Sequence, residues 1–231
     1  MKTETAEWLT IDIRTFWHAG TGKSSGSYLD ALAERNRDGL PVLPGRHIKG
    51  LLRDAYRHAF ALDRIERLPD SLAAALEKSG IGTLEELLFG SISDKEIRTR
   101  TRPGMLRVSS GQLPLSERAA LNAEPTLKPF LYFELFSTAI DANGVASTDS
   151  LRGIEAAAPT RLIARLDLEL TATEPSHLEA QQALLDDECR WEWLDPALAM
   201  MDAVGASRHR GMGEAVITRG AGQQQRREAA A

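Results

Sequence analysis

The segment from Leu43 to Arg57, LPGRHIKGLLRDAYR, constrains the fold of this chain more than any other. It opens with the turn-forming pair Pro44-Gly45, and apolar residues then recur at helical spacing from Ile48 to Phe60. The pattern predicts an amphipathic helix over 46–62 that packs on a core along one face. The start of such a helix carries backbone N–H groups and a partial positive charge, which favour a bound anion.

Basic side chains accompany the apolar face of this predicted helix. Lys49, Arg53 and Arg57 are spaced four residues apart, so they form one stripe. Arg46 and His47 lie in the first turn. We interpret the helix as an element that meets phosphate groups. The alternative is an ordinary surface helix whose Lys and Arg side chains are solvated.

The charges of the chain are unevenly distributed, although the formal net charge is only -5. Residues 35–57 hold six Lys or Arg against two acids, and residues 95–107 hold five against one. Residues 167–202 reverse the balance, with ten acids against Arg190 alone. The distribution predicts one basic surface for a polyanion and a separate acidic surface that faces solvent or a protein neighbour.

Length and composition fit one domain with an insertion and a sizeable core, since 42% of the 231 residues are hydrophobic. Cys189 is the only cysteine, which excludes an intrachain disulfide and a Cys-rich zinc site. The apolar runs are too short to cross a membrane, and no signal peptide opens the sequence. These features predict a cytoplasmic protein.

Periodicity along the chain indicates a mixture of strands and helices. Apolar and polar residues alternate over 8–17 and 162–170, which is typical of half-buried strands. We expect further strands over 105–113 and 130–140, a helical turn near 29–34, and helices over 70–78, 83–89, 176–185 and 196–204. Thr83 is a candidate cap, and Ser176 with Glu179 matches a capping box. The mixture favours an α+β sheet with helices on one face.

Two more segments have the composition of phosphate-binding loops. Gly205–Gly213 combines three glycines with Arg208-His209-Arg210; glycines allow close backbone approach, and Arg supplies several donors. In 97–107, Arg98, Arg100 and Arg102 would share one side of an extended chain. A solvated turn and a solvated loop are the alternative readings of these segments.

The motifs occur in an order that resembles the RAMP superfamily of CRISPR-associated RNA-binding proteins. The residues that carry the resemblance are FWHAGTG at 16–22, LPVLPGRHIKGLLR at 40–53, IDANGVA at 140–146 and GASRHRGMGE at 205–214. Within this superfamily the chain is similar to the backbone subunits of type III effector complexes. It departs from the pattern at Arg46-His47, where the family carries two small hydroxyl residues.

The resemblance implies a modified RNA-recognition-motif (ferredoxin-like) core with a thumb insertion. We expect a single domain over 1–222 with the thumb around 141–160, and a disordered tail over 223–231. The implied partners are a CRISPR guide RNA, a target RNA, other subunits of the effector complex and further copies of this chain. The thumb would wedge between nucleotides of the guide–target duplex.

The resemblance also assigns roles to individual residues. In backbone subunits that cleave target RNA, an aspartate before the Pro-Gly turn carries catalysis with Mg²⁺, and Asp30 matches it by position; its alternative role is a helix cap or surface acid. Asp38 is typical of a turn residue. No histidine pair has the spacing of metal ligands. The residues expected to contact RNA are Arg46, His47, Lys49, Arg53, Arg98, Arg100, Arg102, Arg208, His209 and Arg210.

Three functions remain open from the sequence. The first is a backbone subunit that binds guide RNA and cleaves target RNA through Asp30. The second is a structural scaffold of the complex without catalysis. The third is a guide-processing endoribonuclease, in which His18 or His47 would be the general acid or base.

Overall fold

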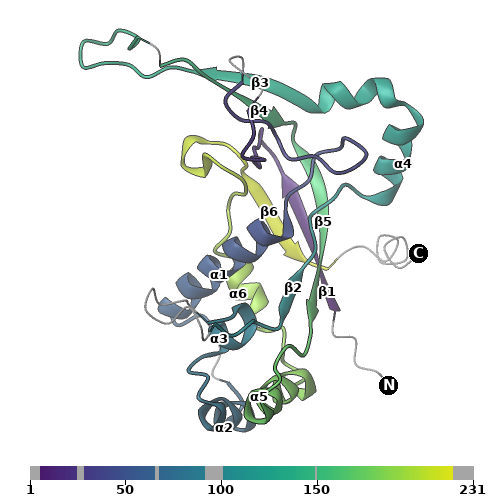
Figure 1. The fold of residues 1–231 in the computed structure, drawn as a ribbon, viewed down its shortest axis with the longest axis vertical. Coiled ribbons are helices and arrows are strands. Elements are labelled where there is room, and N and C mark those ends of the chain that lie inside the picture. Colours follow the sequence, from purple (N-terminus) through teal and green to yellow (C-terminus); the bar gives the residue numbers. More distant parts are fainter. Residues whose placement is uncertain (1–5, 25–28, 66–67, 92–100, 149, 221–231) are drawn as a thin grey trace.

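The computed structural model describes residues 6–24, 29–65, 68–91, 101–148 and 150–220. The elongated molecule has a central sheet, helices on one side and at one end, and a long hairpin at the other end (Figure 1). The strands are β1 (Ala6–Ile13), β2 (Leu106–Val108), β3 (Tyr132–Ser137), β4 (Arg152–Ala157), β5 (Thr160–Leu168) and β6 (Ala215–Arg219). The helices are α1 (Gly45–Ala61), α2 (Asp70–Ser79), α3 (Leu84–Phe89), α4 (Leu115–Ala123), α5 (Pro175–Asp186) and α6 (Leu194–Leu198), with 3-10 helices η2 (Pro125–Leu131) and η3 (Arg208–Arg210).

The main sheet has four strands in the order β2-β5-β1-β6, and every neighbouring pair is antiparallel. With the β3–β4 hairpin, the added helices α2, α3 and α4 and the 3-10 helices set aside, the chain runs through this sheet as β1-α1-β2-β5-α5-α6-β6. This order and topology are those of a ferredoxin-like, RNA-recognition-motif core. The predicted fold class, an α+β core of this type with an inserted hairpin, is therefore confirmed.

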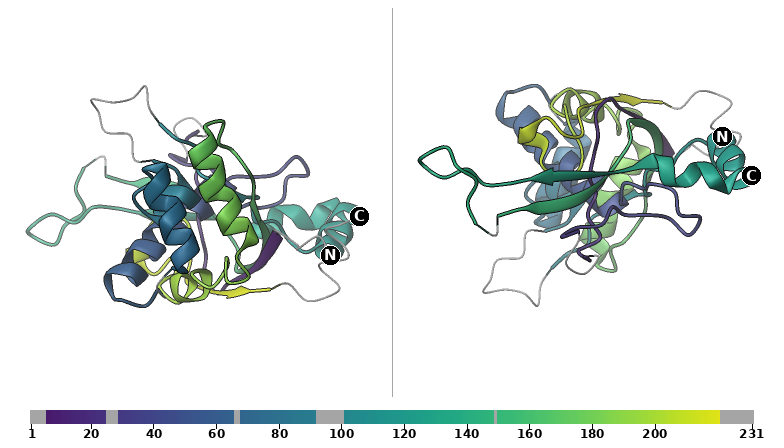
Figure 2. Two further views of the ribbon diagram at one scale, coloured as in Figure 1. Left: turned by 90° about the horizontal axis from the view of Figure 1, so that it is seen from below. Right: turned by 90° about the horizontal axis from the view of Figure 1, so that it is seen from above.

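Alternation along the two central strands produces the core. Leu9, Ile11 and Ile13 of β1 are buried on one face, and Leu162, Ala164, Leu166 and Leu168 of β5 are buried beside them. Helix α1 packs on this region with Ile48 and Leu52, which are almost fully buried. Helix α6 packs against α1 and β6, whereas α2 and α5 pack against each other at the far end of the molecule (Figure 2, left). The apolar stripe of the predicted amphipathic helix thus belongs to the same hydrophobic core as the buried residues of β1 and β5.

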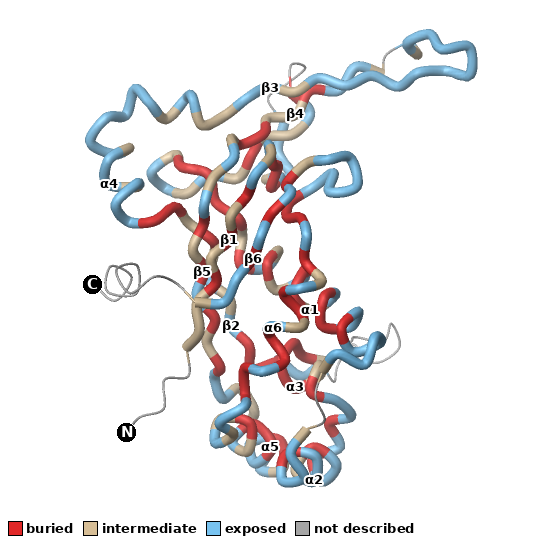
Figure 3. The backbone as a smooth tube through the Cα atoms, turned by 180° about the vertical axis from the view of Figure 1, so that it is seen from behind, coloured by how far each residue is buried: buried red, intermediate tan, exposed pale blue. Residues whose placement is uncertain are grey.

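The second sheet consists of β3 and β4 alone, and it forms an arm that projects from the body. The tip is a turn in which the Asp141 carboxylate accepts hydrogen bonds from the N–H groups of Asn143 and Val145. Figure 3 shows the arm, and the α4–η2 segment that precedes it, as mostly exposed. No helix in the described part of the chain is both long and apolar enough to cross a membrane.

Several predicted element boundaries differ from those of the structure. The expected strand over 130–140 begins as the 3-10 helix η2 and becomes β3 at Tyr132. The arm therefore includes β3, and it starts earlier than the expected thumb at 141. The segment near 29–34 is extended rather than helical, since Ala31 bridges Ile154 and Ala33 bridges Gly20. The last predicted helix is shorter and earlier, at Leu194–Leu198.

Two helix starts show how local signals can succeed or fail. Thr83 caps α3 as predicted, because its hydroxyl accepts a hydrogen bond from the N–H of Glu86 at 3.1 Å. Ser176 does not cap α5, which begins one residue earlier with Pro175 in its first turn. Glu179 pairs instead with Lys78 of α2 at 2.7 Å. The contact between α2 and α5 thus replaces the expected capping box.

Candidate nucleic-acid interface

Four segments that are distant in the sequence converge where the arm joins the body. They are the turn 16–20, the loop 29–35, the first turn of α1 and the loop 205–213. The backbone N–H of Ala206 donates to the carbonyl of His18 at 2.7 Å, and that of Gly213 donates to the carbonyl of Phe16 at 2.8 Å. The segments 16–20 and 205–213 are thus joined at this junction, which we call the arm-base junction.

The glycines of the 205–213 loop allow this close approach. Gly205 has φ +82°, and a Cβ atom there would lie 2.6 Å from the carbonyl oxygen of His18. Gly213 has φ +70°, and a Cβ atom would collide with the carbonyl of Val204. Both positions therefore need glycine for conformation and for space. Between them, η3 carries Arg208, His209 and Arg210 to an exposed position.

The first turn of α1 contributes Arg46 and His47 to the same junction. The backbone N–H of Gly205 donates to Nε2 of His47 at 3.0 Å. Burial, and then the positive charge of Arg208, lower the pKa of His47 below its usual value. Arg46, Arg208 and Arg210 are exposed, and within the described ranges no hydrogen bond or ion pair engages their guanidinium groups. Three cations are therefore available to a ligand near this junction.

The helix start itself is less open than the sequence indicated. The N–H of Gly45 donates to the Ser110 hydroxyl at 3.2 Å, and the N–H of His47 donates to the carbonyl of Pro44. Gly45 lies so close to Val108 and Ser109 that a Cβ atom would collide with their backbone. The Pro44-Gly45 turn thus serves close packing against the segment after β2. A phosphate at this helix start would therefore contact guanidinium groups rather than free backbone amides.

Asp30 lies at the arm base, beside the first residues of β4. Its backbone N–H donates to the carbonyl of Gly153 at 2.8 Å, and its Oδ2 accepts the N–H of Gly153 at 2.9 Å. The side chain is exposed, and Oδ1 has no hydrogen-bond partner among the described residues. The carboxylate is therefore held by one oxygen and offers the other to solvent.

Glu155 joins the loop 29–35 to the arm, a role that the sequence did not indicate. Its carboxylate accepts the N–H of Ala33 at 3.0 Å and pairs with Arg35 at 2.5 Å. The Arg35 guanidinium stacks 3.5 Å over the ring of Tyr132, whose hydroxyl donates to the carbonyl of Gly39. Burial chiefly raises the pKa of Tyr132; the nearby Arg35 charge lowers it and Glu155 raises it. This network fixes the arm relative to Asp30.

Lys49 and Arg53 contact neighbouring elements of the body, whereas the sequence predicted a stripe that meets phosphate, with a solvated helix face as the alternative. Lys49 Nζ donates to the carbonyl of Leu106 at 2.7 Å, and burial, followed by the charges of Arg107 and Arg53, lowers its pKa. Arg53 donates to Glu85 at 2.6 Å and to the carbonyl of Gly90 at 2.8 Å. Glu85 also pairs with Arg57 at 2.7 Å. The stripe is thus a set of internal contacts that bind α1 to α3 and β2.

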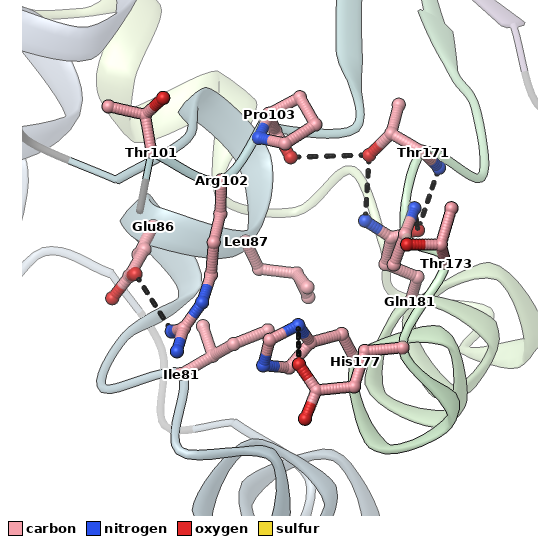
Figure 4. Close-up of a pocket in the computed structure, with 12 residues that line it drawn as sticks. Ile81, Glu86, Leu87, Thr101, Arg102, Pro103, Thr171, Thr173, His177 and Gln181 are labelled. Atoms are coloured by element: carbon pink, nitrogen blue, oxygen red, sulfur yellow. Dashed lines mark hydrogen bonds and ion pairs between the residues drawn. The ribbon is translucent and has the colours of Figure 1, made fainter. Parts of the chain in front are cut away.

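Of the three arginines predicted in the 97–107 loop, the structure describes Arg102. Arg98 and Arg100 lie outside the described residues. Arg102 lines a pocket of about 450 Å³ between α3, α5 and the segment 171–174, where it contacts Glu86 at 3.3 Å (Figure 4). Buried His177 shares this pocket and donates from Nε2 to the carbonyl of Ser79. This pocket lies toward the end of the molecule opposite the arm.

Charge segregation along the chain does not become segregation in space. Arg107, from the second basic segment, pairs with Glu169 of the acidic segment at 3.0 Å. Arg53 and Arg57, from the first basic segment, pair with Glu85. The predicted separate basic and acidic surfaces are therefore wrong for these residues. Arg46 in the first turn of α1 and Arg208 and Arg210 in η3 are among the exposed cations that lack an acidic partner in the described residues.

The fold and the junction together define a class of protein. A four-stranded RNA-recognition-motif sheet carries an inserted hairpin, and a glycine loop closes against the first strand and helix. A scan of protein families matches residues 10–216 to the RAMP superfamily. This chain belongs to that superfamily.

Solved structures with a similar fold come from CRISPR complexes. A chain of the type III-B Cmr-beta complex in the apo state has a TM-score of 0.55 at 11% identity, covering 95% of this chain and 98% of that chain. A chain of the type III-B Cmr-beta complex bound to cognate target RNA has a TM-score of 0.56 at 10% identity, with the same coverage. A type IV-B CRISPR complex chain has a TM-score of 0.52 at 17% identity, covering 94% and 91%. At such identities the likeness shows a shared fold. No curated protein matches the chain.

Proposed function

We propose that this chain is a backbone subunit of a cytoplasmic type III CRISPR effector ribonucleoprotein, and that it grips guide RNA at the arm-base junction. The observation that carries the proposal is the set of unpaired, exposed guanidinium groups of Arg46, Arg208 and Arg210 at that junction. Arginine groups without internal partners can form multidentate hydrogen bonds to phosphate. The RAMP fold and its likeness to CRISPR complex subunits favour guide RNA as the polyanion that these arginines bind.

The arm has the side chains needed to contact bases. Phe136, Ile140 and Leu151 are between 49% and 69% exposed, so the arm displays apolar groups in water. Apolar and aromatic side chains stack on unpaired bases or separate neighbouring base steps. We therefore assign to the arm the wedge between nucleotides of the guide–target duplex. The ion pair between Glu155 and Arg35 fixes the base of the arm. The wedge would therefore keep a constant position relative to the bound guide RNA.

Asp30 is the proposed catalytic residue for cleavage of target RNA. Its free Oδ1 would orient the 2′-hydroxyl of the target nucleotide or take up its proton, while the hydrogen bond from Gly153 holds Oδ2 in place. Within the described ranges no group of three or more acidic, His or Cys side chains could hold a metal. A Mg²⁺ ion here would therefore be held by Asp30 and the RNA phosphates, which is common for this ion. When bound, it would supply positive charge beside the reacting phosphate.

The engagement of both candidate histidines disfavours guide processing by this chain. His18 is 5% exposed and donates from Nδ1 to the carbonyl of Glu155 at 2.6 Å. Nε2 of His47 is the acceptor of the Gly205 N–H. A general base needs an imidazole nitrogen within reach of the substrate. A scaffold without catalysis remains the second candidate, and the arginines of the junction serve it equally well.

The proposal is tested with the chain in its assembled complex. Short guide RNA should co-elute with the complex, and the affinity of the purified chain for single-stranded guide RNA should fall steeply with salt. Each phosphate contact contributes a log–log slope of about -0.7. A slope near zero between 50 and 200 mM salt would refute a phosphate-led interface. Labelled target RNA that stays intact with Mg²⁺ would select the scaffold over the nuclease.

A further inference from the structure

His47 makes an unusual contact for a residue in a basic cluster. Nε2 of its imidazole accepts a hydrogen bond from the backbone N–H of Gly205 at 3.0 Å. An imidazole nitrogen accepts only when it carries no proton, so the remaining proton of the neutral ring is on Nδ1. The contact therefore requires neutral His47, and it joins the first turn of α1 to the start of the 205–213 loop.

The loop is held at its start from two sides. The N–H of Ala206 donates to the carbonyl of His18, while the neighbouring N–H of Gly205 donates to His47. Gly205 lies against His18 with space for no Cβ atom. Three residues later the chain enters η3 and presents Arg208 and Arg210. The contact with His47 is thus one of the bonds that place these two arginines, beside the backbone bonds of Ala206 and Gly213.

The charged and titratable groups around His47 would oppose its protonation. Burial lowers the pKa of His47, and the nearby charge of Arg208 lowers it further. Arg46 precedes His47 on α1, and His209 and Arg210 follow Arg208 in η3. On the turn 16–20, His18 is bonded to the carbonyl of Glu155. No carboxylate forms an ion pair with His47 in the described part of the chain. A proton on Nε2 would remove the acceptor and add a positive charge beside Arg208.

We propose that His47 is a pH-sensitive positioning residue: its neutral ring latches the glycine loop against α1, and its protonation releases the loop. Release of the loop should weaken the binding of guide RNA in acid. This consequence rests on the proposed RNA-binding function. The direction of the pH dependence follows from the lowered pKa of His47. The docked state has the lower pKa, so the latch is complete above about pH 6.5 and is lost as pH falls through the docked pKa. A histidine that bound phosphate directly would show the opposite sign, because protonation would strengthen binding.

The latch itself is tested on the full chain without RNA. ¹⁵N NMR of the imidazole should show the proton of His47 on Nδ1 at pH 7.5. The amide signal of Gly205 should shift with the titration of that ring between pH 7.5 and 5. A proton on Nε2 at pH 7.5, or a Gly205 amide that ignores the titration, would overturn the latch whether or not RNA binds.

The consequence is tested with single-stranded guide RNA at pH 7.5 and pH 5.5. We expect wild-type affinity to fall about three- to tenfold in acid, as for the loss of one hydrogen bond. His47→Gln keeps an acceptor but does not titrate, so it should bind well and lose the acid effect. His47→Leu should bind weakly at both pH values while keeping its melting temperature within a few degrees.

Another histidine variant serves as the control for this measurement. His58→Gln, on the exposed last turn of α1, should retain the acid-induced loss. Affinity that rises in acid, or an acid effect that survives His47→Gln, would refute the proposal. Absence of RNA binding by every protein at pH 7.5 would refute the proposed function, and the NMR result would then decide the latch alone.

Discussion

The first turn of α1 and its later turns carry the same kind of side chain but use it differently. In the first turn, Arg46 is exposed beside a loop that presents Arg208 and Arg210, and these guanidinium groups have no acidic partner among the described residues. Two and three turns later, Arg53 and Arg57 share the carboxylate of Glu85. Lysine and arginine at helical spacing therefore do not by themselves define an RNA surface. Whether a nearby carboxylate already satisfies each cation decides which cations can meet a ligand.

The largest expected effect lies at the arm-base junction, in Asp30→Asn. The amide oxygen can still accept the Gly153 N–H, but it carries no charge and cannot take up a proton. We expect the rate of target RNA cleavage by the assembled complex to fall about 100-fold or more, with guide affinity unchanged. Cleavage is measured on a denaturing gel with labelled target and Mg²⁺.

Asp38→Ala is the matched control for this variant. Asp38 lies in the same region, where its backbone N–H is bonded to the Asn36 side chain and its carbonyl accepts from Lys128. Its replacement should leave the cleavage rate within about twofold. Full cleavage by Asp30→Asn would show that this carboxylate is only a structural contact.

The next effect tests the unpaired cations directly. Arg208→Ala combined with Arg210→Ala should lower guide RNA affinity about 10- to 100-fold, since hydrogen bonds to charged groups contribute about 1.5–3 kcal/mol. The log–log salt slope should become shallower by about 1.4, from two lost phosphate contacts. Fluorescence anisotropy at several salt concentrations measures both quantities.

Arg102→Ala provides the comparison at the opposite end of the molecule. Its guanidinium already contacts Glu86 and the carbonyl of Gly80, so RNA affinity should stay within about twofold. If Arg102→Ala lowered RNA affinity as much as the Arg208→Ala/Arg210→Ala double variant, the distinction between paired and unpaired cations would be wrong.

The third prediction concerns the stability of the fold, which a paired arginine should affect more than an unpaired one. Arg53→Ala should lower the free energy of unfolding by about 1–3 kcal/mol, because it leaves Glu85 and the Gly90 carbonyl without this half-buried partner. Arg46→Ala should change it by less than about 0.5 kcal/mol. Urea denaturation measures both, with an unchanged m-value. If Arg53→Ala weakens guide binding without loss of stability, the stripe on α1 is an RNA surface after all.

The smallest effect is a pH dependence of the same cluster. Burial alone would raise the pKa of Glu85, but hydrogen bonds and charges from Arg57 and Arg53 outweigh it and lower the pKa. The stabilisation is therefore present above the unfolded value near 4.5 and is lost as pH falls through the lowered pKa. Relative to Glu85→Gln, wild type should be more stable by about 1 kcal/mol at pH 7 and by almost nothing below pH 3. A difference of equal size at both pH values would exclude the carboxylate charge as its source.

The elements that the sequence predicted well are those with one buried face. The alternation over 8–17 and 162–170 became β1 and β5, and the apolar stripe of 46–62 became α1. Burial on one face imposes a period on the sequence, and that period can be read without a structure. Strand β4 has no such clear signal, because its buried residues are the small Gly153, Ala156 and Ala157, which do not alternate with polar residues.

Candidate site residues were partly predictable for a related reason. The motifs at 16–22, 40–53 and 205–214 identified segments that do converge. The motifs could not show that Lys49 and Arg53 turn inward or that Arg102 lies at the other end, since those outcomes depend on partners far along the chain. The contacts of Glu155 and Tyr132 could not be predicted, because their partners, Arg35 and Gly39, lie about a hundred residues upstream.

The sequence by itself determined the α+β class, the two central strands, the principal helix and membership of the RAMP superfamily, because these depend on local periodicity and on motifs in order. The tertiary structure alone decided which charges are free. A carboxylate within about 3 Å satisfies a guanidinium group, and only folding places Glu85 beside Arg53 while it leaves Arg46 and Arg208 exposed without such a partner among the described residues. It likewise placed the imidazole of His47 against the amide of Gly205, a contact that spans 158 positions of the chain.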